Sequence, residues 1–299
     1  MSALLETAVT ALALSALAVA CLALLPNAPP RVRFGACVAG LAAWLVPWAW
    51  IRIPLAPRSL AAPLRESIAS FEMLRGTLAA DATPDTAAVA GYLAAAAFLA
   101  GLALFAADWM ALRRCVRRWH AASAPADELR AELPPELRDV PAEIRVVRDS
   151  RVAAASGWIR PTVWIGDGYT GASRKLVLTH EMWHAHRHDP AWLALIAAVR
   201  RAYWWNPLVG YLAREAVLML ESSCDLRCAT ALGKQSYVTG LATLMLEDAA
   251  PSPRLIAAVR SASFNVARLR LLGASRWLRA RDVALLVALA TMEIGRAHV

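Results

Sequence analysis

The sequence predicts a membrane α-helical protein with an attached α+β domain that is mostly helical. Three observations predict this fold class. The 299 residues are 59% hydrophobic with a mean hydropathy of +0.44, which is too apolar for a soluble protein of this length. Three long uncharged runs lie within residues 1–112, and a far more polar segment follows at residues 113–281.

The three uncharged runs are long enough to cross a bilayer. They cover residues 7–25, 34–51 and 87–107, with 19, 18 and 21 residues. A hydrocarbon core of about 30 Å needs roughly 20 helical residues at about 1.5 Å each. We therefore predict transmembrane helices at about residues 5–25, 34–53 and 87–110, which form a membrane domain over residues 1–112. A cleaved signal peptide is the alternative for the first run, but the start carries Glu6 and no basic residue.

The charges that flank these runs predict an orientation. Arg31 and Arg33 follow the first run without an acid, whereas residues 52–86 hold four Arg and four acids. The third run ends in four Arg within six residues, at residues 113–118. Because cytoplasmic flanks are enriched in basic residues, we predict a multi-pass protein of the inner (cytoplasmic) cell membrane. Its N-terminus lies outside, and the domain after residue 112 is cytoplasmic.

The formal net charge of +9 also fits a nucleic-acid-binding protein. The arginines, however, cluster at the ends of apolar runs and do not alternate with aromatic residues along a groove. We therefore predict the lipid bilayer as a partner and no direct binding of nucleic acid. The five cysteines show no paired framework, so no disulfide scaffold is predicted.

Residues 113–281 predict a separate domain. Residues 126–143 are acidic and contain prolines, a composition typical of a linker with a short helix. Residues 144–147 and 157–168 mix β-branched and aromatic residues with turn formers and predict two or three short strands. Helices are predicted from an N-cap at Ser173 to about residue 189, and over residues 208–229.

The C-terminal residues predict a membrane helix that is cut short. Residues 282–292 have the composition of a fourth span but are too few to cross a bilayer. Residues 293–299 match the in-frame translation of a widely used sequencing adapter. We therefore expect this last segment to be an artefact and the native C-terminal region to be missing.

The segment His180-Glu181-Met182-Trp183-His184 predicts a catalytic metal site. Residues four apart share one face of a helix, so His180 and His184 can present imidazoles to a single ion. Glu181 lies one position along and can act as the general base on a metal-activated water, which then attacks a peptide carbonyl. A strand near residues 161–165 is expected to hold the substrate in extended form along its edge.

A catalytic zinc usually keeps three side-chain ligands and one open position. The candidates for the third ligand are Glu215 and Glu221. Asp225 lies four residues after Glu221 on the same helix face, so one carboxylate can reach the metal while the other holds a ligand imidazole. We prefer Glu221, because Glu215 lies beside Arg214 in the pattern of a salt bridge.

A structural metal site is the alternative at this position. Cys224 and Cys228 are also four apart, and two Cys with two His would form a closed site. In such a closed site Glu181 would have no catalytic role.

These motifs resemble the BlaR/MecR family of antirepressor membrane zinc metalloproteases. The resemblance covers most of the chain. It is carried by His180-Glu181-x-x-His184-x-x-Arg187-x-Asp189, Gly157-x-x-Arg160-Pro161, Asn206-Pro207 and Glu221-x-x-Cys224-Asp225. The sequence departs from the family after the Arg-Pro pair, where it has Ile165-Gly166-Asp167 in place of Leu-Pro or similar.

The resemblance implies three membrane helices, a cytoplasmic zincin (gluzincin-like) domain and a fourth helix. It implies that His180, His184 and Glu221 bind zinc, that Glu181 is the base and that Asp225 supports the ligands from behind. It also implies cleavage of a cytoplasmic protein substrate, a DNA-binding transcriptional repressor, and of the chain itself. The inducing signal and a homodimeric state are left open.

Two other functions share parts of this pattern. Quality-control membrane metalloproteases of the prenyl-protease and heat-shock type also combine the two histidines with a downstream Glu. The Cys224-Asp225 pair and the Arg187-x-Asp189 motif favour the antirepressor family. A non-enzymatic membrane signal transducer with a structural zinc is the second alternative.

Overall fold

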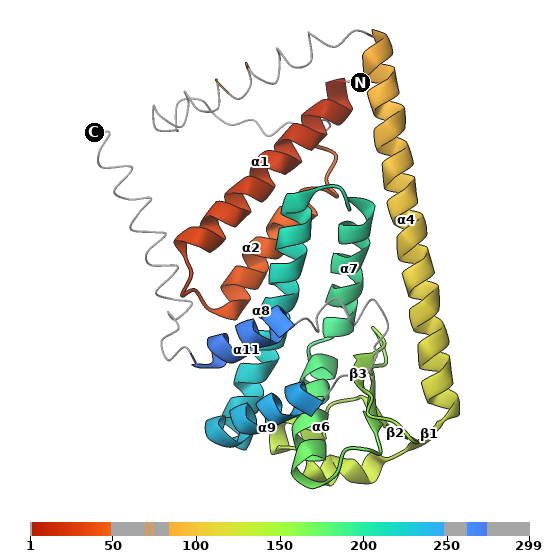
Figure 1. Cartoon of the computed structure of the whole chain (residues 1–299), viewed down its shortest axis with the longest axis vertical. Coiled ribbons are helices and arrows are strands. Elements are labelled where there is room, and N and C mark those ends of the chain that lie inside the picture. The colour runs from red at the N-terminus through yellow and green to blue at the C-terminus, as the bar shows by residue number, and fades with distance from the viewer. Residues whose placement is uncertain (1, 49–69, 71–72, 74–83, 248–261, 274–299) are drawn as a thin grey trace, which may run out of the picture. The chain divides into compact units, whose positions relative to one another are not determined.

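The structure, a computed structural model, describes residues 2–48, 70, 73, 84–247 and 262–273 and is mostly helical (Figure 1). The described residues fall into two compact units. One is drawn from Met1–Gly101 and Ala202–Leu212, and the other from Leu102–Arg201 and Ala213–Ser275. Two long helices, α4 (Pro84–Ala121) and α8 (Pro207–Leu232), contribute residues to both units.

The first unit is built on the pair α1 (Ser2–Leu24) and α2 (Pro30–Ala42). Pro30 stands in the first turn of α2, where a missing N–H costs nothing. The two helices approach closely, since the Ser15 hydroxyl donates to the Gly40 carbonyl at 3.0 Å. A Cβ on Gly40 would meet the Cβ of Ala18 at 2.9 Å, so a glycine is needed at this crossing.

Two described helical segments are long and apolar enough to cross a membrane, Glu6–Leu24 and Ala88–Ala121. They coincide with the first and third predicted spans, although α4 continues to Ala121. The second helix differs from its predicted bounds of residues 34–53, because α2 begins at Pro30 and ends at Ala42. The prolines explain the difference: Pro29-Pro30 starts the helix early, and Pro47 offers no N–H for its continuation. Residues 49–53, 282–292 and 293–299 lie outside the described residues.

The second unit contains a four-stranded sheet in the order β1-β2-β4-β3. β2 and β4 are parallel, and the two outer pairs are antiparallel. The strands are β1 (Ser123–Pro125), β2 (Glu143–Val147), β3 (Ala153–Ser156) and β4 (Thr162–Gly166). The expectation that residues 161–165 offer a free edge is therefore wrong, because β4 is paired on both sides. The outer strands of the sheet are β1 and β3, and of these β3 lies beside β4.

Helices cover both faces of this sheet (Figure 1). Val163 and Ile165 of β4 belong to the main core with Leu178 and Met182 of α6 (Gly171–His186). Trp164 points to the opposite face and packs with Trp119 near the end of α4. The alternation of side chains along β4 thus places the sheet between α6 and α4.

The remaining helices of this unit frame the sheet and α6. They are η2 (Asp127–Glu132), α5 (Pro135–Arg138), α7 (Asp189–Ala202), the second part of α8, α9 (Lys234–Glu247) and α11 (Ala262–Gly273). The long helix predicted over residues 208–229 is α8. The segment of residues 126–143 forms η2 and α5 before it enters β2.

A substitution at Gly166, the last residue of β4, tests how closely the sheet is packed. A Cβ at this position would lie 2.1 Å from the carbonyl oxygen of Ser150, in the loop between β2 and β3. We expect Gly166→Ala to lower the free energy of unfolding by at least about 1–3 kcal/mol, since the backbone must move. Thermal unfolding of the purified chain in detergent measures the effect.

The matched control is Gly210→Ala in α8, where a Cβ meets nothing within 4 Å. This variant is expected to be neutral or more stable by about 0.5–1 kcal/mol, because alanine favours the helix over glycine. Equal melting temperatures for the two variants would contradict the crowding at Gly166.

Candidate metal centre

His180 and His184 lie on one face of α6. Thr170, in an extended conformation, is the N-cap of this helix, and Ser173 stands at its third position with its hydroxyl accepting the Thr170 N–H at 3.3 Å. The expected N-cap at Ser173 is therefore wrong by one turn. The two imidazoles are buried, and their Nε2 atoms lie 3.1 Å apart.

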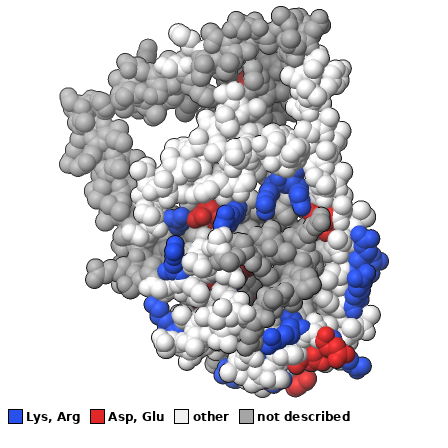
Figure 2. Space-filling model, viewed as in Figure 1, with Lys and Arg blue, Asp and Glu red and all other residues white. Residues whose placement is uncertain are grey.

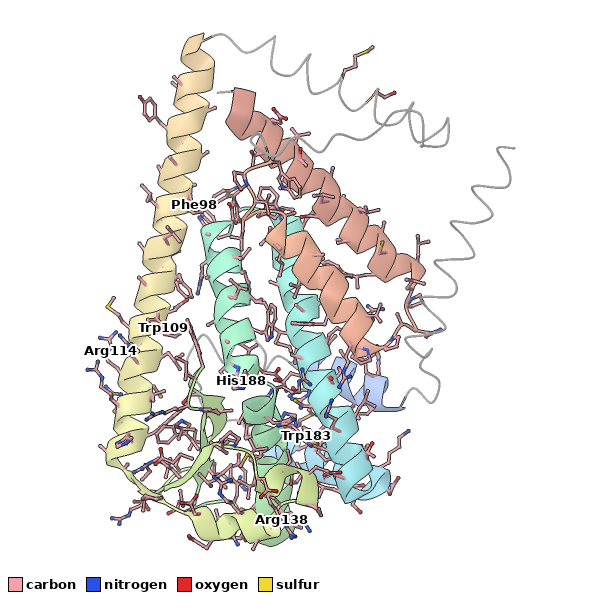
Figure 3. All side chains as sticks on the ribbon, turned by 180° about the vertical axis from the view of Figure 1, so that it is seen from behind. Phe98, Trp109, Arg114, Arg138, Trp183 and His188 are labelled. Carbon is pink, nitrogen blue, oxygen red and sulfur yellow. The ribbon has the colours of Figure 1, made fainter. Side chains whose placement is uncertain are left out.

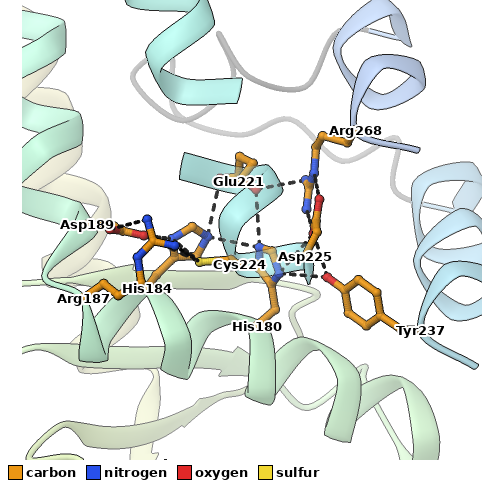
Figure 4. A network of polar contacts seen from close by, with 9 residues as sticks. All are labelled: His180, His184, Arg187, Asp189, Glu221, Cys224, Asp225, Tyr237 and Arg268. Atoms are coloured by element: carbon orange, nitrogen blue, oxygen red, sulfur yellow. Dashed lines mark hydrogen bonds and ion pairs between the residues drawn. The ribbon is translucent and has the colours of Figure 1, made fainter. Parts of the chain in front are cut away.

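Glu221 of α8 meets both imidazoles (Figure 4). Its Oε2 lies 3.4 Å from Nε2 of His180, and its Oε1 lies 3.5 Å from Nε2 of His184. The structure thus brings together the three residues that the sequence proposed as ligands. Glu215 belongs to neither of the groups of potential metal ligands found among the described residues.

The spacing of these atoms fits a metal ion. Ligand bonds of about 2.0–2.1 Å in tetrahedral geometry place neighbouring ligand atoms about 3.3–3.4 Å apart. The two Nε2 atoms lie 3.1 Å apart, and each lies 3.4 or 3.5 Å from a different oxygen of Glu221, which is close to that value. Two imidazole nitrogens and one carboxylate are also the donor set of catalytic sites that keep a position open. The residues present therefore fit a divalent metal with one free coordination position.

The far nitrogen of each imidazole is held by a buried acceptor. Nδ1 of His184 lies 2.8 Å from Oδ2 of Asp189, the first residue of α7. Nδ1 of His180 lies 3.0 Å from the hydroxyl of Tyr237 on α9, which in turn donates to Oδ1 of Asp225 at 2.7 Å. With a metal bound, each Nδ1 would donate its proton to this oxygen partner, and each Nε2 lone pair would face the metal position.

Asp225 lies behind the ligand His180, as the sequence proposed. It contacts His180 mainly through Tyr237, which the sequence did not identify. Its Oδ1 is 3.5 Å from Nδ1 of His180, and the Tyr237 hydroxyl makes the shorter contact. Burial and the adjacent Asp225 carboxylate raise the pKa of Tyr237, so its proton remains available for the bond to Asp225. No sequence signal pointed to Tyr237, which lies 57 residues from His180.

Arg268 of α11 pairs with two carboxylates at the centre, those of Glu221 and Asp225 (Figure 4). Its guanidinium lies 3.0 Å from Oε2 of Glu221 and binds both oxygens of Asp225, at 2.7 and 2.9 Å. Burial alone would raise the pKa of Glu221. The charge of Arg268 and the neighbouring imidazoles outweigh burial and hold that pKa well below its ordinary value, so Glu221 is an anion.

Cys224 borders the centre, but it does not form the closed site that was the alternative to a catalytic one. Its Sγ lies 3.4 Å from Nδ1 of His184 and 3.6 Å from Oδ2 of Asp189, on the side away from Glu221. Cys228 belongs to no group of potential ligands among the described residues. The arrangement of two His with two Cys around one point is therefore not formed.

A cavity of about 1010 Å³ opens beside the three ligands. Glu181 lies on its wall with His180, His184 and Glu221, and the edge strand β3 lines it from Ala153 to Ser156. A group bound in this cavity reaches the metal position, the candidate base and a strand with a free edge.

Comparison with known proteins gives two matches. The family model described as BlaR1 peptidase M56 matches residues 7–268. The protein named Regulatory protein BlaR1 of Bacillus licheniformis is 33% identical over 85 residues, which cover 27% of this chain and 14% of that relative. The aligned part of the chain therefore spans well under two thirds of the relative's length. Because the family match covers most of the chain and includes every residue of the centre from His180 to Arg268, the chain belongs to the BlaR1 peptidase M56 family.

Proposed function

We propose that the chain is a membrane-embedded zinc metalloendopeptidase that acts in signal transduction. The observation that carries the proposal is the convergence of His180, His184 and Glu221, whose ligand atoms lie within 4.8 Å of one another, on the wall of a cavity that also holds Glu181. A donor set of two neutral imidazoles and one carboxylate suits zinc. The membership of a peptidase family supports the same chemistry.

A zinc ion held by His180, His184 and Glu221 would lower the pKa of a bound water and polarise a peptide carbonyl. Glu181, on the cavity wall, would act as the general base that takes one proton from the attacking water as the new C–O bond forms. It then passes the proton to the nitrogen of the leaving amine as the C–N bond breaks. The protein residues that fix the reaction geometry are Asp189 and Tyr237, which hold the two imidazoles in orientation.

The free edge of β3 is the proposed docking strand for the substrate. Because β4 occupies only one side of β3, an extended peptide can add to the other side through main-chain hydrogen bonds. This mode positions a scissile bond without reading its sequence. The lining of the cavity by residues 153–156 supports this placement.

We propose a cytoplasmic substrate, a DNA-binding transcriptional repressor, together with cleavage of the chain itself. The word "regulatory" in the relative's name and the orientation predicted from the flanking arginines support this part. The alternatives are a quality-control membrane protease and a non-enzymatic transducer with structural zinc. The cavity beside the ligands favours a peptidase over a purely structural site, which is normally closed.

Glu181→Gln separates a peptidase from a structural zinc protein. We expect the variant to keep its zinc, since Glu181 is not among the three ligands, and to lose about 10²- to 10⁴-fold in cleavage rate, since the base is gone. Zinc content is measured on the purified chain by atomic emission, and cleavage on an internally quenched peptide library. Glu136→Gln on the short helix α5 is the control with the same chemical change. Normal cleavage by Glu181→Gln would refute the peptidase function.

Tyr237→Phe tests the support of His180. Removing the hydroxyl leaves Nδ1 of His180 without its 3.0 Å partner, so we expect zinc affinity to fall about 10- to 100-fold. Competition with a chromophoric chelator measures the affinity. Tyr169→Phe is the matched control, because its buried hydroxyl bonds to the Arg151 carbonyl instead. Equal affinities in the two variants would show that the hydroxyl does not support the metal.

Reporter fusions test the proposed orientation. A reporter enzyme active only in the cytoplasm is expected to be active after Trp119 and inactive after Pro57, because the arginines at residues 113–118 favour the cytoplasmic side. A reporter active only outside should give the reverse pattern. Outside activity of the Trp119 fusion would exclude a cytoplasmic substrate.

A further inference from the structure

The cavity wall carries two charged residues that the metal centre does not use. Besides Glu181, Glu221 and Arg268, the acidic and basic residues on this wall are Arg113 and Arg117 of α4. They are four apart and therefore lie on one face of the helix. The sequence explained them only as part of a basic flank to a membrane span.

The neighbouring arginines on α4 differ in direction. Arg114 and Arg118 are not on the cavity wall, and Figure 3 shows Arg114 projecting from the outer side of the helix. Figure 2 shows the basic side chains gathered along the lower part of α4. A role in membrane orientation explains all four arginines equally. It gives no reason for two of them to line the cavity.

Arg113 and Arg117 have no acidic partner among the residues that the structure describes. The surrounding wall is mostly apolar, with Trp109, Leu112 and Val116 from α4 and further side chains from α9. Arg113 and Arg117 are themselves exposed to solvent, so their attraction for an acidic group is that of a partly screened ion pair. Within the described part of the chain, the cavity therefore presents two guanidinium groups without an acidic partner at its α4 side.

The α4 side of the cavity is fixed to the rest of the unit. The rings of Trp119 and Trp164 lie 6.0 Å apart, centre to centre, and Trp109 lies 5.7 Å from Trp158 just beyond β3. Arg201 of α7 forms an ion pair with Asp108 of α4, with Nε 2.8 Å from Oδ2. Arg113 and Arg117 thus keep a defined position relative to the edge of β3.

We infer that Arg113 and Arg117 form a specificity subsite for acidic side chains of the peptide that binds along β3. This inference rests on the proposed peptidase function and defines its substrate class. The peptide places its scissile bond at the metal centre and an Asp or Glu at the α4 side of the cavity. Apolar residues of the peptide contact the walls from α4 and α9.

The test begins with the full chain in detergent and a proteome-derived peptide library whose cleavage sites are identified by mass spectrometry. We expect Asp and Glu to be enriched about 3- to 10-fold at one position near the scissile bond, as two partly exposed ion pairs allow. The double variant R113E/R117E should lose this preference and favour Lys and Arg. The control R114E/R118E changes the flanking charge equally and should keep the wild-type preference.

A binding measurement provides a readout independent of turnover. A fluorescent peptide based on the preferred site, in an Asp and a Lys version, is titrated onto Glu181→Gln protein. The Asp version should bind about 3- to 10-fold more tightly, and about 0.5 M salt should remove the difference by screening. R113E/R117E in the same background should reverse the order.

The possible outcomes distinguish failure of the acidic-side-chain subsite from failure of the proposed peptidase function. If wild-type protein cuts no more of the library than Glu181→Gln, the peptidase function itself fails. If it cuts without an acidic preference, or if both double variants behave alike, the subsite is refuted. Weaker binding of R113E/R117E to anionic lipid vesicles with an unchanged cleavage pattern would also overturn it and assign the arginines to lipid headgroups.

Discussion

Burial of the Glu221 carboxylate constrains the whole second unit. Removing such a charge from water costs several kcal/mol, which must be offset by close partners of opposite charge or by hydrogen bonds. The partners come from separate elements: two imidazoles from α6 and the guanidinium of Arg268 from α11. The position of one carboxylate on α8 therefore fixes three helices relative to one another. The same guanidinium also binds Asp225, one turn further along α8.

The hydrophobic core sets the position of the imidazoles. Leu178 and Met182 are completely buried and belong to the cluster with the inner residues of β2 and β4. His180 and His184 alternate with them along the same helix, so the packing that seats α6 on the sheet also directs the imidazoles toward α8. Side chains in a well-packed core tolerate little displacement. The metal centre is thereby preorganised by apolar contacts that never touch it.

The local features of the site could be predicted from the sequence, because helical spacing is a short-range property. The pairs at residues 180/184 and 221/225 each lie one turn apart, and the structure places them accordingly. Tyr237 and Arg268 could not be identified, since their roles arise from contacts across 57 and 43 residues. The sequence around Tyr237 and Arg268 does not differ from that around other helical tyrosines and arginines. Only the folded structure shows which of them reach the centre.

The strands also show where prediction from the sequence fails. β4 was predicted because Thr162-Val-Trp-Ile165 has strong β-propensity, whereas β3, Ala153-Ala-Ala-Ser156, has almost none. Pairing with β4 holds β3 in place in spite of its composition. The edge that faces the cavity was therefore assigned to the wrong strand. Small side chains at that edge leave room for another backbone to approach.

The formal charges around the centre indicate why a divalent cation belongs there. Four carboxylates lie at or beside the two imidazoles: Glu181, Asp189, Glu221 and Asp225. Two guanidinium groups face them, Arg187 on Asp189 and Arg268 on Glu221 and Asp225. If the imidazoles are neutral, as metal ligands are, the cluster has two negative charges in excess, which a divalent metal would balance. A cluster arranged only for stability would need no such excess, because well-packed apolar residues are often as stable as buried ion pairs. The imbalance is instead what a metal site with a separate anionic base requires, since the ligand carboxylate and the base must both remain charged.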